Sequence, residues 1–556
     1  MRRLLAPLLL LLITALVLFP AFSGIASYVI GDGGDNYQFL GFQWLGHRLW
    51  SAGGFPFGWT DYWRYPHGIQ FQSATDSTLL VLVGLVLYPL LRDPVVVYNT
   101  AVIAILIANA TLSYLAFRTW FGRPQALLGA IVYGLSFYSL GKIGGHVNLI
   151  TTAGFALCAA AVYRLQEAKR PRAAWVQLVL ACLTVAFASL QYPLILLGAL
   201  PFAAVLTLLF FPAAVQALVQ TLGRQWLALA LSAAALAGAF GLFHGRKLLD
   251  LARGEVQLPP ETIITVPAVN FVSANRYLPV AAAALSNSTR PWIEYAVFFG
   301  YVEIALAVAA LVALPRSRVK WYLAAATALF LVLSLGRWPY PHLFRVLPYR
   351  GIIEPARFCT IAYLAATILI LLLLERIERK WVLAAIGVLL VAERLPRHFH
   401  RSSAHRDPEL VAAVRSRPTR AVLDLPAYTS WWNGQLYDLY SVHYDRPIVM
   451  GYIHWSGDGP ASSRLVRELA AFGCHVNPQE APHETDPGRL RQKAAQILAL
   501  LREHGIRTVV LHKDLFRSDP ECGTAQLYID ALLEPREQWE IVLDTPAKRV
   551  LWRRND

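Results

Sequence analysis

Residues 95–117 read VVVYNTAVIAILIANATLSYLAF, a stretch without a charged side chain. As a helix, such a stretch is long enough to cross about 30 Å of hydrocarbon. Two further runs are predominantly apolar and long enough to cross, MRRLLAPLLLLLITALVLFPAF (1–22), which begins with two arginines, and CTIAYLAATILILLLL (359–374). These runs do not alternate as barrel strands do, and a backbone in lipid must satisfy its own hydrogen bonds. The sequence therefore predicts a polytopic α-helical membrane protein.

The composition of the whole chain agrees with this prediction. Of its 556 residues, 56% are hydrophobic and 15% are charged, whereas a soluble domain carries about 25% charged residues. This excludes disordered, coiled-coil and disulfide-scaffold classes. The net charge of +15 is typical of basic loops that orient membrane helices and meet anionic lipid, so membrane lipids are expected partners and nucleic acid is not. The five cysteines show no spacing typical of a zinc site.

Short basic loops predict the sidedness of the chain. PRSRVK (315–320), ERIERK (375–380) and RLQEAKRPR (164–172) are expected on the cytoplasmic side. The loop near 244–294 and everything after about residue 395 then lie outside. The first segment lacks a small-residue cleavage pattern, so we interpret it as a retained first span. The other predicted spans lie near 95–117, 125–141, 147–164, 173–190, 194–211, 225–243, 295–314, 320–336, 358–375 and 380–394.

One apolar run does not fit this alternation. TDSTLLVLVGLVLYPLL (75–91) has only about 15 apolar residues, which is short for a crossing. We interpret it as a juxtamembrane or re-entrant helix on the outer face, which leaves about 11 spans with the N terminus inside. If residues 77–92 do span the membrane, the early loops change side.

Two parts of the chain are predicted to lie outside the membrane. Residues 1–395 form a transmembrane domain whose first outer loop covers 22–94, and residues 396–556 form an extracytoplasmic α/β domain. The strand-like runs of this second domain are RAVLDLP (420–426), RPIVMGY (446–452) and GIRTVVLH (505–512), and its tail predicts a hairpin turning at Thr545 and Pro546.

The first outer loop contains a predicted helix. NYQFLGFQWLGHRLW (36–50) places Phe42, Leu45 and Leu49 on one helical face. Its aromatic residues favour a helix that lies in the headgroup zone of the bilayer.

Two aspartates mark the end of the first span. GDGGD (31–35) places Asp32 and Asp35 on the outer face, where one carboxylate near its ordinary pKa could accept a proton from an attacking hydroxyl. Asp35 is the first candidate for this base and Asp32 the second. The alternative is a polar helix end, which the three glycines also favour. A divalent cation shared by the two carboxylates is a further hypothesis, although oxygen ligands alone are weak evidence, and no other cofactor is predicted.

The layout of the chain resembles the GT-C glycosyltransferases, a superfamily that includes protein O-mannosyltransferases and aminoarabinose transferases. The resemblance rests on an outer aspartate after the first span, an amphipathic helix, and an outer domain at the C-terminal end. The matching strings are YPHGIQF (65–71), GKIGGHVN (141–148) and YRGIIEPARF (349–358). The Asp-Glu pair of the O-mannosyltransferase branch is replaced here by GDGGD.

The resemblance implies a hexosyl- or pentosyltransferase in a bacterial inner membrane. Its donor would be a polyprenyl-phosphate sugar, and its acceptor a glycan, lipid or protein on the periplasmic face. The acceptor hydroxyl would attack with inversion, and fixed cations would stabilise the departing phosphate. The outer-side candidates for this role are Arg357 and Arg350, then Lys142 and His146, then Arg64 and His67. For each arginine the alternative is an anchor to lipid headgroups.

Two other classes of function remain open. A lipid or glycolipid transporter predicts charges deep inside the spans and paired broken helices, of which few are visible. A non-catalytic scaffold of envelope glycan assembly could keep the same fold with a degenerate site. We interpret Glu294 and Glu303 as solvated helix ends. The enzyme hypothesis requires that Asp35 and Arg357 share one site.

Overall fold

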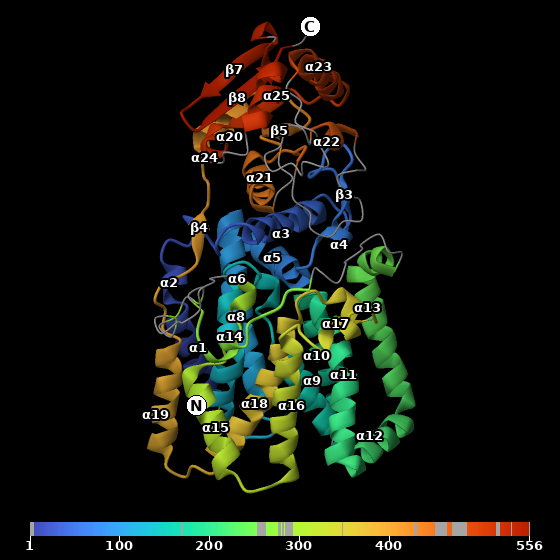
Figure 1. Cartoon of the computed structure of the whole chain (residues 1–556), viewed down its shortest axis with the longest axis vertical. Helices are drawn as coiled ribbons and strands as arrows, with labels where there is room; N and C mark the ends of the chain where they lie inside the picture. The colour runs from blue at the N-terminus through green and yellow to red at the C-terminus, as the bar shows by residue number, and fades with distance from the viewer. Residues whose placement is uncertain are drawn as a thin grey trace.

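The structure is a computed structural model that describes residues 5–167, 171–252, 263–275, 278, 280, 283, 293–346, 348–427, 431–450, 464–469, 486–518, 523–534 and 536–554. It is elongated, with a helical region at one end and a β-sheet at the other (Figure 1). Five helical segments of the described chain are long and apolar enough to cross a membrane: Pro94–Phe117, Val147–Glu167, Gln191–Phe210, Trp226–Lys247 and Pro355–Leu374. Four shorter apolar helices accompany them: Ala6–Val17, Thr78–Leu91, Arg172–Ala188 and Tyr301–Ala313. The membrane character of the chain is therefore supported, and the count of about 11 spans stays a prediction.

The elements of the helical region follow in chain order. They are α1 (Leu5–Val17), α2 (Phe19–Phe22), α6 (Pro94–Phe117), α7 (Arg123–Gly129), η1 (Ala130–Gly134), α8 (Phe137–Lys142), η2 (Val147–Leu149), α9 (Ala153–Glu167), α10 (Pro171–Ala188), α11 (Gln191–Phe210), α12 (Pro212–Arg224), α13 (Trp226–Ala252), α14 (Val269–Val272), η5 (Ile293–Tyr295), α15 (Tyr301–Ala313), α16 (Arg318–Ser334), α17 (Tyr340–Leu343), η6 (Tyr349–Gly351), η7 (Pro355–Phe358), α18 (Cys359–Leu374) and α19 (Lys380–Glu393).

The predicted span near 125–141 is not one continuous α-helix. It consists of α7, the π-helical turn η1 and the short helix α8. At the break, a Cβ on Gly134 would lie 2.7 Å from the Cα of Ala110, so this backbone runs directly against α6. Ser136 then caps α8 by accepting a hydrogen bond from the Ser139 amide at 3.3 Å. The break brings Lys142 to the end of a separate short helix.

The first outer loop contains β1 (Tyr28–Ile30), α3 (Asp35–Ser51), β2 (Trp59–Thr60), β3 (Ile69–Gln70), α4 (Phe71–Ala74) and α5 (Thr78–Leu91). The predicted helix is confirmed as α3, and its expected place in the headgroup zone stays a prediction. Phe42 and Leu45 are buried, because α5 packs on one side of α3 and α21 (Trp431–Tyr444) on another. Tyr37, Phe39, Phe42 and Trp44 of this helix therefore belong to a protein core, whereas Trp50 is exposed.

The C-terminal part of the chain builds a four-stranded sheet in the order β5-β6-β8-β7. Its strands are β5 (Val422–Leu425), β6 (Thr508–His512), β7 (Trp539–Asp544) and β8 (Lys548–Arg553). β5 and β6 run parallel, and the other neighbours run antiparallel. The accompanying elements are α20 (Pro408–Arg415), α21, α22 (Arg464–Leu469), α23 (Pro487–Glu503), α24 (Lys513–Ser518), α25 (Gly523–Leu533) and η11 (Arg536–Gln538).

Three of the predicted strand runs are found in this sheet and one is not. The tail hairpin is confirmed, and the Thr545 amide closes its turn by donating to the Lys548 carbonyl at 2.8 Å. The described part of the run 446–452, which ends at residue 450, contributes an isolated bridge between Ile448 and Val422, and the Ile448 carbonyl accepts a hydrogen bond from the Tyr65 amide at 3.0 Å. The boundary at residues 395/396 stays a prediction.

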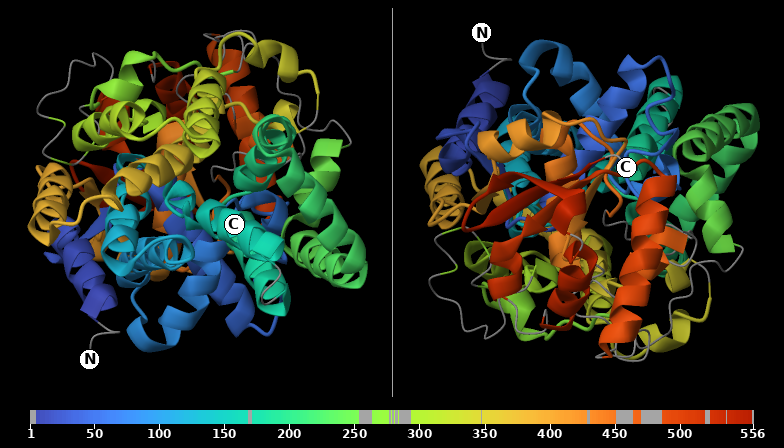
Figure 2. Two further views of the ribbon diagram at one scale, coloured as in Figure 1. Left: turned by 90° about the horizontal axis from the view of Figure 1, so that it is seen from below. Right: turned by 90° about the horizontal axis from the view of Figure 1, so that it is seen from above.

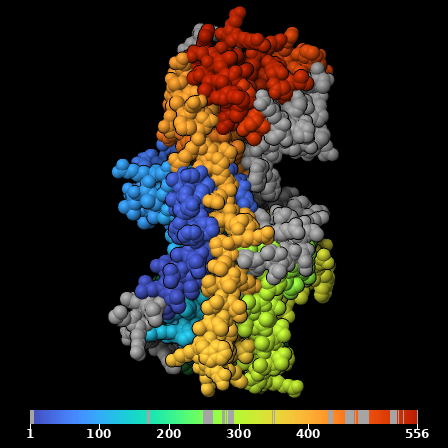
Figure 3. Space-filling view, turned by 90° about the vertical axis from the view of Figure 1, so that its left-hand side faces the viewer, coloured from blue at the N-terminus to red at the C-terminus, as the bar shows by residue number. Residues whose placement is uncertain are grey.

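The segment between α19 and α20 (394–407), which we call the strap, joins the two ends of the molecule. After α19 the chain runs alongside the N-terminal elements toward the sheet (Figure 3). On the way, β4 (Arg401–Ser403) pairs antiparallel with β1, so that Val29 lies opposite Ser402. Seen from above, the sheet and its helices cover the first-loop elements (Figure 2). One buried apolar cluster accordingly runs from the first loop into the C-terminal sheet, and a second fills the helical region.

Candidate functional site

The loop GDGGD and the loop GKIGGH meet at the top of the helical region. The Asp32 amide donates to the Gly144 carbonyl at 2.7 Å, and the Asn36 side chain donates to the Ile143 carbonyl at 3.2 Å. Gly31 makes this approach possible: its φ is +118°, and a Cβ there would lie 2.0 Å from the Asn36 side chain. The glycines predicted as a polar helix end thus allow the two loops to pack together.

Asp35 begins α3 and keeps part of its carboxylate open to solvent. A helix N-terminus favours a negative charge in its first turn. Oδ2 of Asp35 lies 3.1 Å from Nε2 of His146, and Oδ1 of Asp35 accepts a hydrogen bond from Nε2 of Gln435, on α21. The Asp35 side chain is 29% exposed, which leaves it accessible to a substrate.

Glu294, on η5, is the centre of the charged groups behind Asp35. Its Oε1 lies 2.6 Å from Nδ1 of His146 and 3.1 Å from Nη2 of Arg357, and its Oε2 lies 2.7 Å from Nζ of Lys142. Arg357 also pairs with Glu354 at 3.3 Å. We call these residues the Glu294 cluster: Asp35, His146, Glu294, Lys142, Arg357 and Glu354.

The cluster joins Asp35 and Arg357 within one site, as the enzyme hypothesis requires. The ionised groups alternate in sign from Asp35 through His146 and Glu294 to Arg357. Glu294 and Arg357 are almost fully buried, while Asp35 and His146 form the accessible edge. The interpretation of Glu294 as a solvated helix end is wrong, because three positively charged or protonatable side chains surround it in the protein interior.

The protonation of His146 follows from its two neighbours. Both ring nitrogens face carboxylates, and only the imidazolium form carries a proton on each nitrogen. Burial lowers the pKa of His146, but the carboxylates of Glu294 and Asp35 outweigh burial, so this pKa is raised above its ordinary value of 6.5. Burial likewise raises the pKa of Glu294, and the three basic groups around it more than reverse this, leaving the pKa well below its ordinary value.

Asp32 has a different partner from Asp35. Its Oδ1 lies 2.5 Å from Nδ1 of His400, on the strap that leads to β4. Within the described residues, no group of three or more His, Cys, Asp or Glu side chains is arranged to hold a metal ion. A cation shared by Asp32 and Asp35 therefore stays a hypothesis, and the structure pairs each aspartate with a separate histidine.

The remaining predicted residues lie elsewhere or only partly within the description. Arg350 belongs to η6, and its side chain lies outside the described part. Arg64 and His67 lie in the loop between β2 and β3, where the His67 amide donates to the Arg64 carbonyl at 2.9 Å. Among the described contacts, neither side chain joins the Glu294 cluster, and His67 lines a separate pocket. Glu303 pairs with Arg394 in the interior, so its interpretation as a solvated helix end is also wrong.

Comparisons with known proteins identify relatives of this fold only in solved structures. No family model and no curated protein matches the sequence. The arabinofuranosyltransferase AftD from mycobacteria matches 98% of this chain with a TM-score of 0.50 and 14% identity, and this chain spans 40% of its length. The oligosaccharyltransferase of Archaeoglobus fulgidus in the apo form matches 94% of this chain and 72% of its own, with a TM-score of 0.50 and 11% identity. ArnT from Cupriavidus metallidurans, solved with undecaprenyl phosphate, matches 98% of this chain and 97% of its own at a TM-score of 0.37 and 13% identity.

Proposed function

We propose that this chain, whose fold is that of the GT-C glycosyltransferases, transfers a hexose or pentose from a polyprenyl-phosphate carrier to a hydroxyl acceptor. The acceptor is a glycan, lipid or protein presented on the periplasmic face of a bacterial inner membrane. The observation that carries this proposal is the Glu294 cluster, which places an accessible carboxylate beside a positively charged histidine and two buried cations.

Asp35 acts as the general base in this proposal. It takes the proton of the acceptor hydroxyl while the acceptor oxygen forms a bond to the anomeric carbon. The bond from that carbon to the phosphate oxygen breaks on the opposite side, so the configuration inverts and polyprenyl phosphate leaves with an additional negative charge. Gln435 and His146 each hold one oxygen of the Asp35 carboxylate, which fixes its direction.

The cations of the cluster stabilise the leaving phosphate. His146 is the positive group at the accessible edge, because its side chain is 21% exposed and its pKa is raised. Lys142 and Arg357 lie behind Glu294 and add positive charge from a region without solvent, where electrostatic effects are strong. Direct contact between Arg357 and the phosphate stays a prediction, since Glu294 and Glu354 already pair with its guanidinium.

Replacement of the base tests the mechanism. Membranes containing the Asp35→Asn variant should transfer radiolabelled sugar from polyprenyl phosphate about 10²–10⁴ times more slowly than the wild type. Asp61→Asn is the matched control, since Asp61 lies in the same outer loop and has no part in the Glu294 cluster. Full transfer by a folded Asp35→Asn protein would remove the assignment of the base. Movement of unchanged lipid-linked sugar across the membrane, without transfer, would instead identify a transporter.

A further inference from the structure

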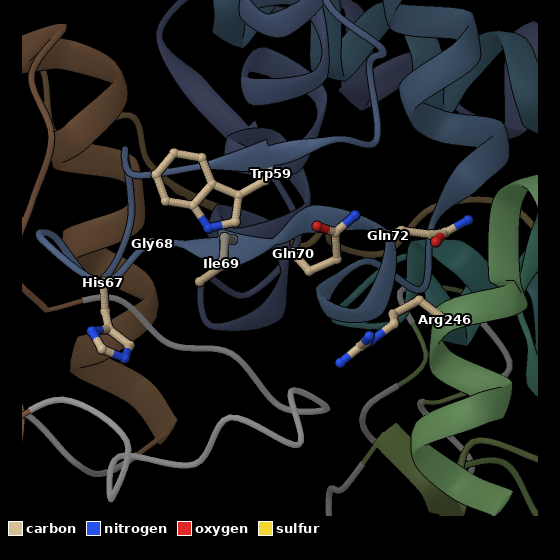
Figure 4. A pocket seen from close by; sticks show the side chains of 7 residues that line it. All are labelled: Trp59, His67, Gly68, Ile69, Gln70, Gln72 and Arg246. Carbon is tan, nitrogen blue, oxygen red and sulfur yellow. The ribbon is translucent and has the colours of Figure 1, made fainter.

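A pocket of about 440 Å³ lies between the first outer loop and α13. The short β2–β3 hairpin forms one wall, and the end of α13 carries Arg246 toward it from the other (Figure 4). The side chains that line it with polar or aromatic groups are Trp59, His67, Gln70, Gln72 and Arg246. None of these residues belongs to the Glu294 cluster.

The pocket presents an indole ring in a fixed orientation. Trp59 is 57% exposed, although tryptophan usually buries most of its large apolar surface. Gly68 supports the ring from behind: a Cβ there would lie 2.5 Å from Cζ2 of Trp59, and its φ of +74° suits glycine. The indole is therefore held against the backbone of the hairpin loop and still faces solvent.

Planar polar groups surround this indole. Gln70 lies opposite Trp59 in the β2–β3 pairing, and His67, Gln72 and Arg246 complete the lining. Two amides, an imidazole and a guanidinium offer several donors and acceptors at defined angles. A sugar ring has an apolar C–H face that stacks on an aromatic ring and hydroxyl groups that need such partners. An exposed indole with polar neighbours in a concave site thus fits a saccharide better than a lipid tail.

The two walls of the pocket are fastened together. Nε2 of Gln72 donates to the Leu242 carbonyl on α13, and the backbone amides of Phe71 and Gln72 donate to the carbonyls of Gly58 and Phe57 at 3.1 Å each. These bonds connect α4, the hairpin and α13 around the cavity. Hydrogen bonds within the fold therefore hold the walls of the pocket in place.

The partly buried carboxylate of Asp76 joins the segment after α4 to the loop that carries His146. Asp76, shortly after α4, accepts hydrogen bonds from the Asn148 side chain at 3.0 Å, the Ser189 hydroxyl at 2.9 Å and the Leu190 amide at 2.8 Å. Asn148 follows His146 by two positions in the same loop. The chain that leaves the pocket through α4 is thus hydrogen-bonded to the loop that carries His146.

We propose that this pocket is a saccharide subsite that binds a sugar unit of the acceptor glycan away from the reacting hydroxyl. The inference rests on the glycosyltransferase function proposed above and names its acceptor as a saccharide chain. Trp59 provides the stacking surface, and the side chains of Gln70, His67 and Arg246, with Oε1 of Gln72, bind the hydroxyl groups.

Binding to the full chain tests this subsite without requiring transfer. Calorimetry on the Asp35→Asn protein in nanodiscs, with no donor present, would use an arabinofuranose hexasaccharide and a mannose hexasaccharide as furanose and pyranose probes. At least one should bind, and Trp59→Ala should weaken its Kd about tenfold through loss of ring stacking. Trp50→Ala is the matched control, because Trp50 lies on the same outer loop, is 59% exposed and does not line the pocket.

The possible results separate this proposal from the proposed function. Absence of binding by both saccharides, or equal weakening by Trp59→Ala and Trp50→Ala, would overturn the subsite even if sugar transfer is observed. Loss of polyprenyl-phosphate binding in Trp59→Ala, with saccharide binding intact, would also overturn it. Saccharide binding that depends on Trp59 in a protein without transfer activity would support the subsite and contradict the enzyme.

Discussion

His146 makes the activity of the site dependent on pH. Its ion pairs with Asp35 and Glu294 need the imidazolium form, and its folded-state pKa is raised above 6.5. Because the folded value is the higher one, the stabilisation from these pairs is complete below about pH 6.5 and is lost as the pH rises through the folded value. The rate of transfer should therefore fall along a basic limb that begins above the ordinary imidazole range. A kcat/KM profile from pH 5 to 10 would measure it, with His146→Gln, which cannot titrate, as the comparison; an unchanged basic limb in that variant would assign the limb to another group.

Most of the site residues are predictable one by one, whereas their arrangement is not. Asp35, His146, Lys142 and Arg357 stand in loops that are predicted to lie on the outer side beside spans, where an ionisable side chain has a reason to be functional. The same argument could have identified Glu294, because it stands in the apolar run WIEYAVFF. The interpretation as a solvated helix end was chosen because water alone would satisfy the carboxylate there, without a partner from another segment. Its three partners come from distant segments, and their approach depends on packing that no short window of sequence contains.

At the scale of elements, the turn at Gly31 controls where α3 begins. An alanine there combines a φ of +118° with a Cβ placed 2.0 Å from the Asn36 side chain, so the start of α3 must move. A displacement of about 1 Å at a reacting group can cost about 10²-fold in rate. We therefore expect Gly31→Ala to lower kcat by about this factor while the protein still folds, as size-exclusion and thermal unfolding in detergent would show.

Gly53→Ala is the matched control for this turn. Gly53 has a φ of +80°, but a Cβ there meets no atom within 4 Å. The variant should thus lose about 1 kcal/mol of stability from backbone strain and keep its transfer rate. Equal loss of activity in both variants would show that strain in the outer loop, and not the Gly31–Asn36 contact, sets the position of Asp35.

Elements with a clear local pattern were predicted, and elements shaped by their neighbours were not. The hairpin of β7 and β8 follows from alternation and a turn, and the apolar helices follow from their length. The burial of Phe42 and Trp44 on α3 was not predictable, because aromatic residues suit both a bilayer interface and a protein core, and the cover supplied by α21 and α5 is not visible in the local sequence. The π-helical break in the span near 125–141 was not predicted, and at this break Gly134 lies directly against α6.

At the scale of the whole molecule, the C-terminal part completes the site at the first loop. Gln435 reaches Asp35, and His400 reaches Asp32, across separations of 400 and 368 positions in the chain. The Trp63 indole also donates to the Ser441 hydroxyl at 2.9 Å. Hydropathy and charge predict that both segments lie on the same side of the membrane, and they contain no information on which side chains meet. The division into a helical region and a C-terminal α/β part was therefore predictable from the sequence, whereas the side-chain contacts between the first loop and the C-terminal part were not.

The sidedness of the chain can be tested at three exposed positions. Arg316 and Glu378 lie in the loops α15–α16 and α18–α19, and Glu409 lies in α20, at the sheet end of the molecule (Figure 1). The basic residues of both loops predict a cytoplasmic location, whereas Glu409 should lie outside, because α19 is predicted to cross between it and Glu378. A single cysteine at each position, in a chain whose five native cysteines are replaced, would be probed with a membrane-impermeant maleimide.

The expected pattern is labelling of Glu409→Cys in intact cells and labelling of Arg316→Cys and Glu378→Cys only after the membrane is opened. The pattern bears on the mechanism because Asp35 is joined to the C-terminal part through Gln435, so the side that holds Glu409 also holds the base. A polyprenyl-phosphate donor presents its sugar at one membrane surface, and transfer requires the base at that same surface. Labelling of Glu409→Cys only in opened membranes would place Asp35 in the cytoplasm and contradict a periplasmic acceptor, whereas labelling of Glu378→Cys and Glu409→Cys from the same side would show that α19 does not cross.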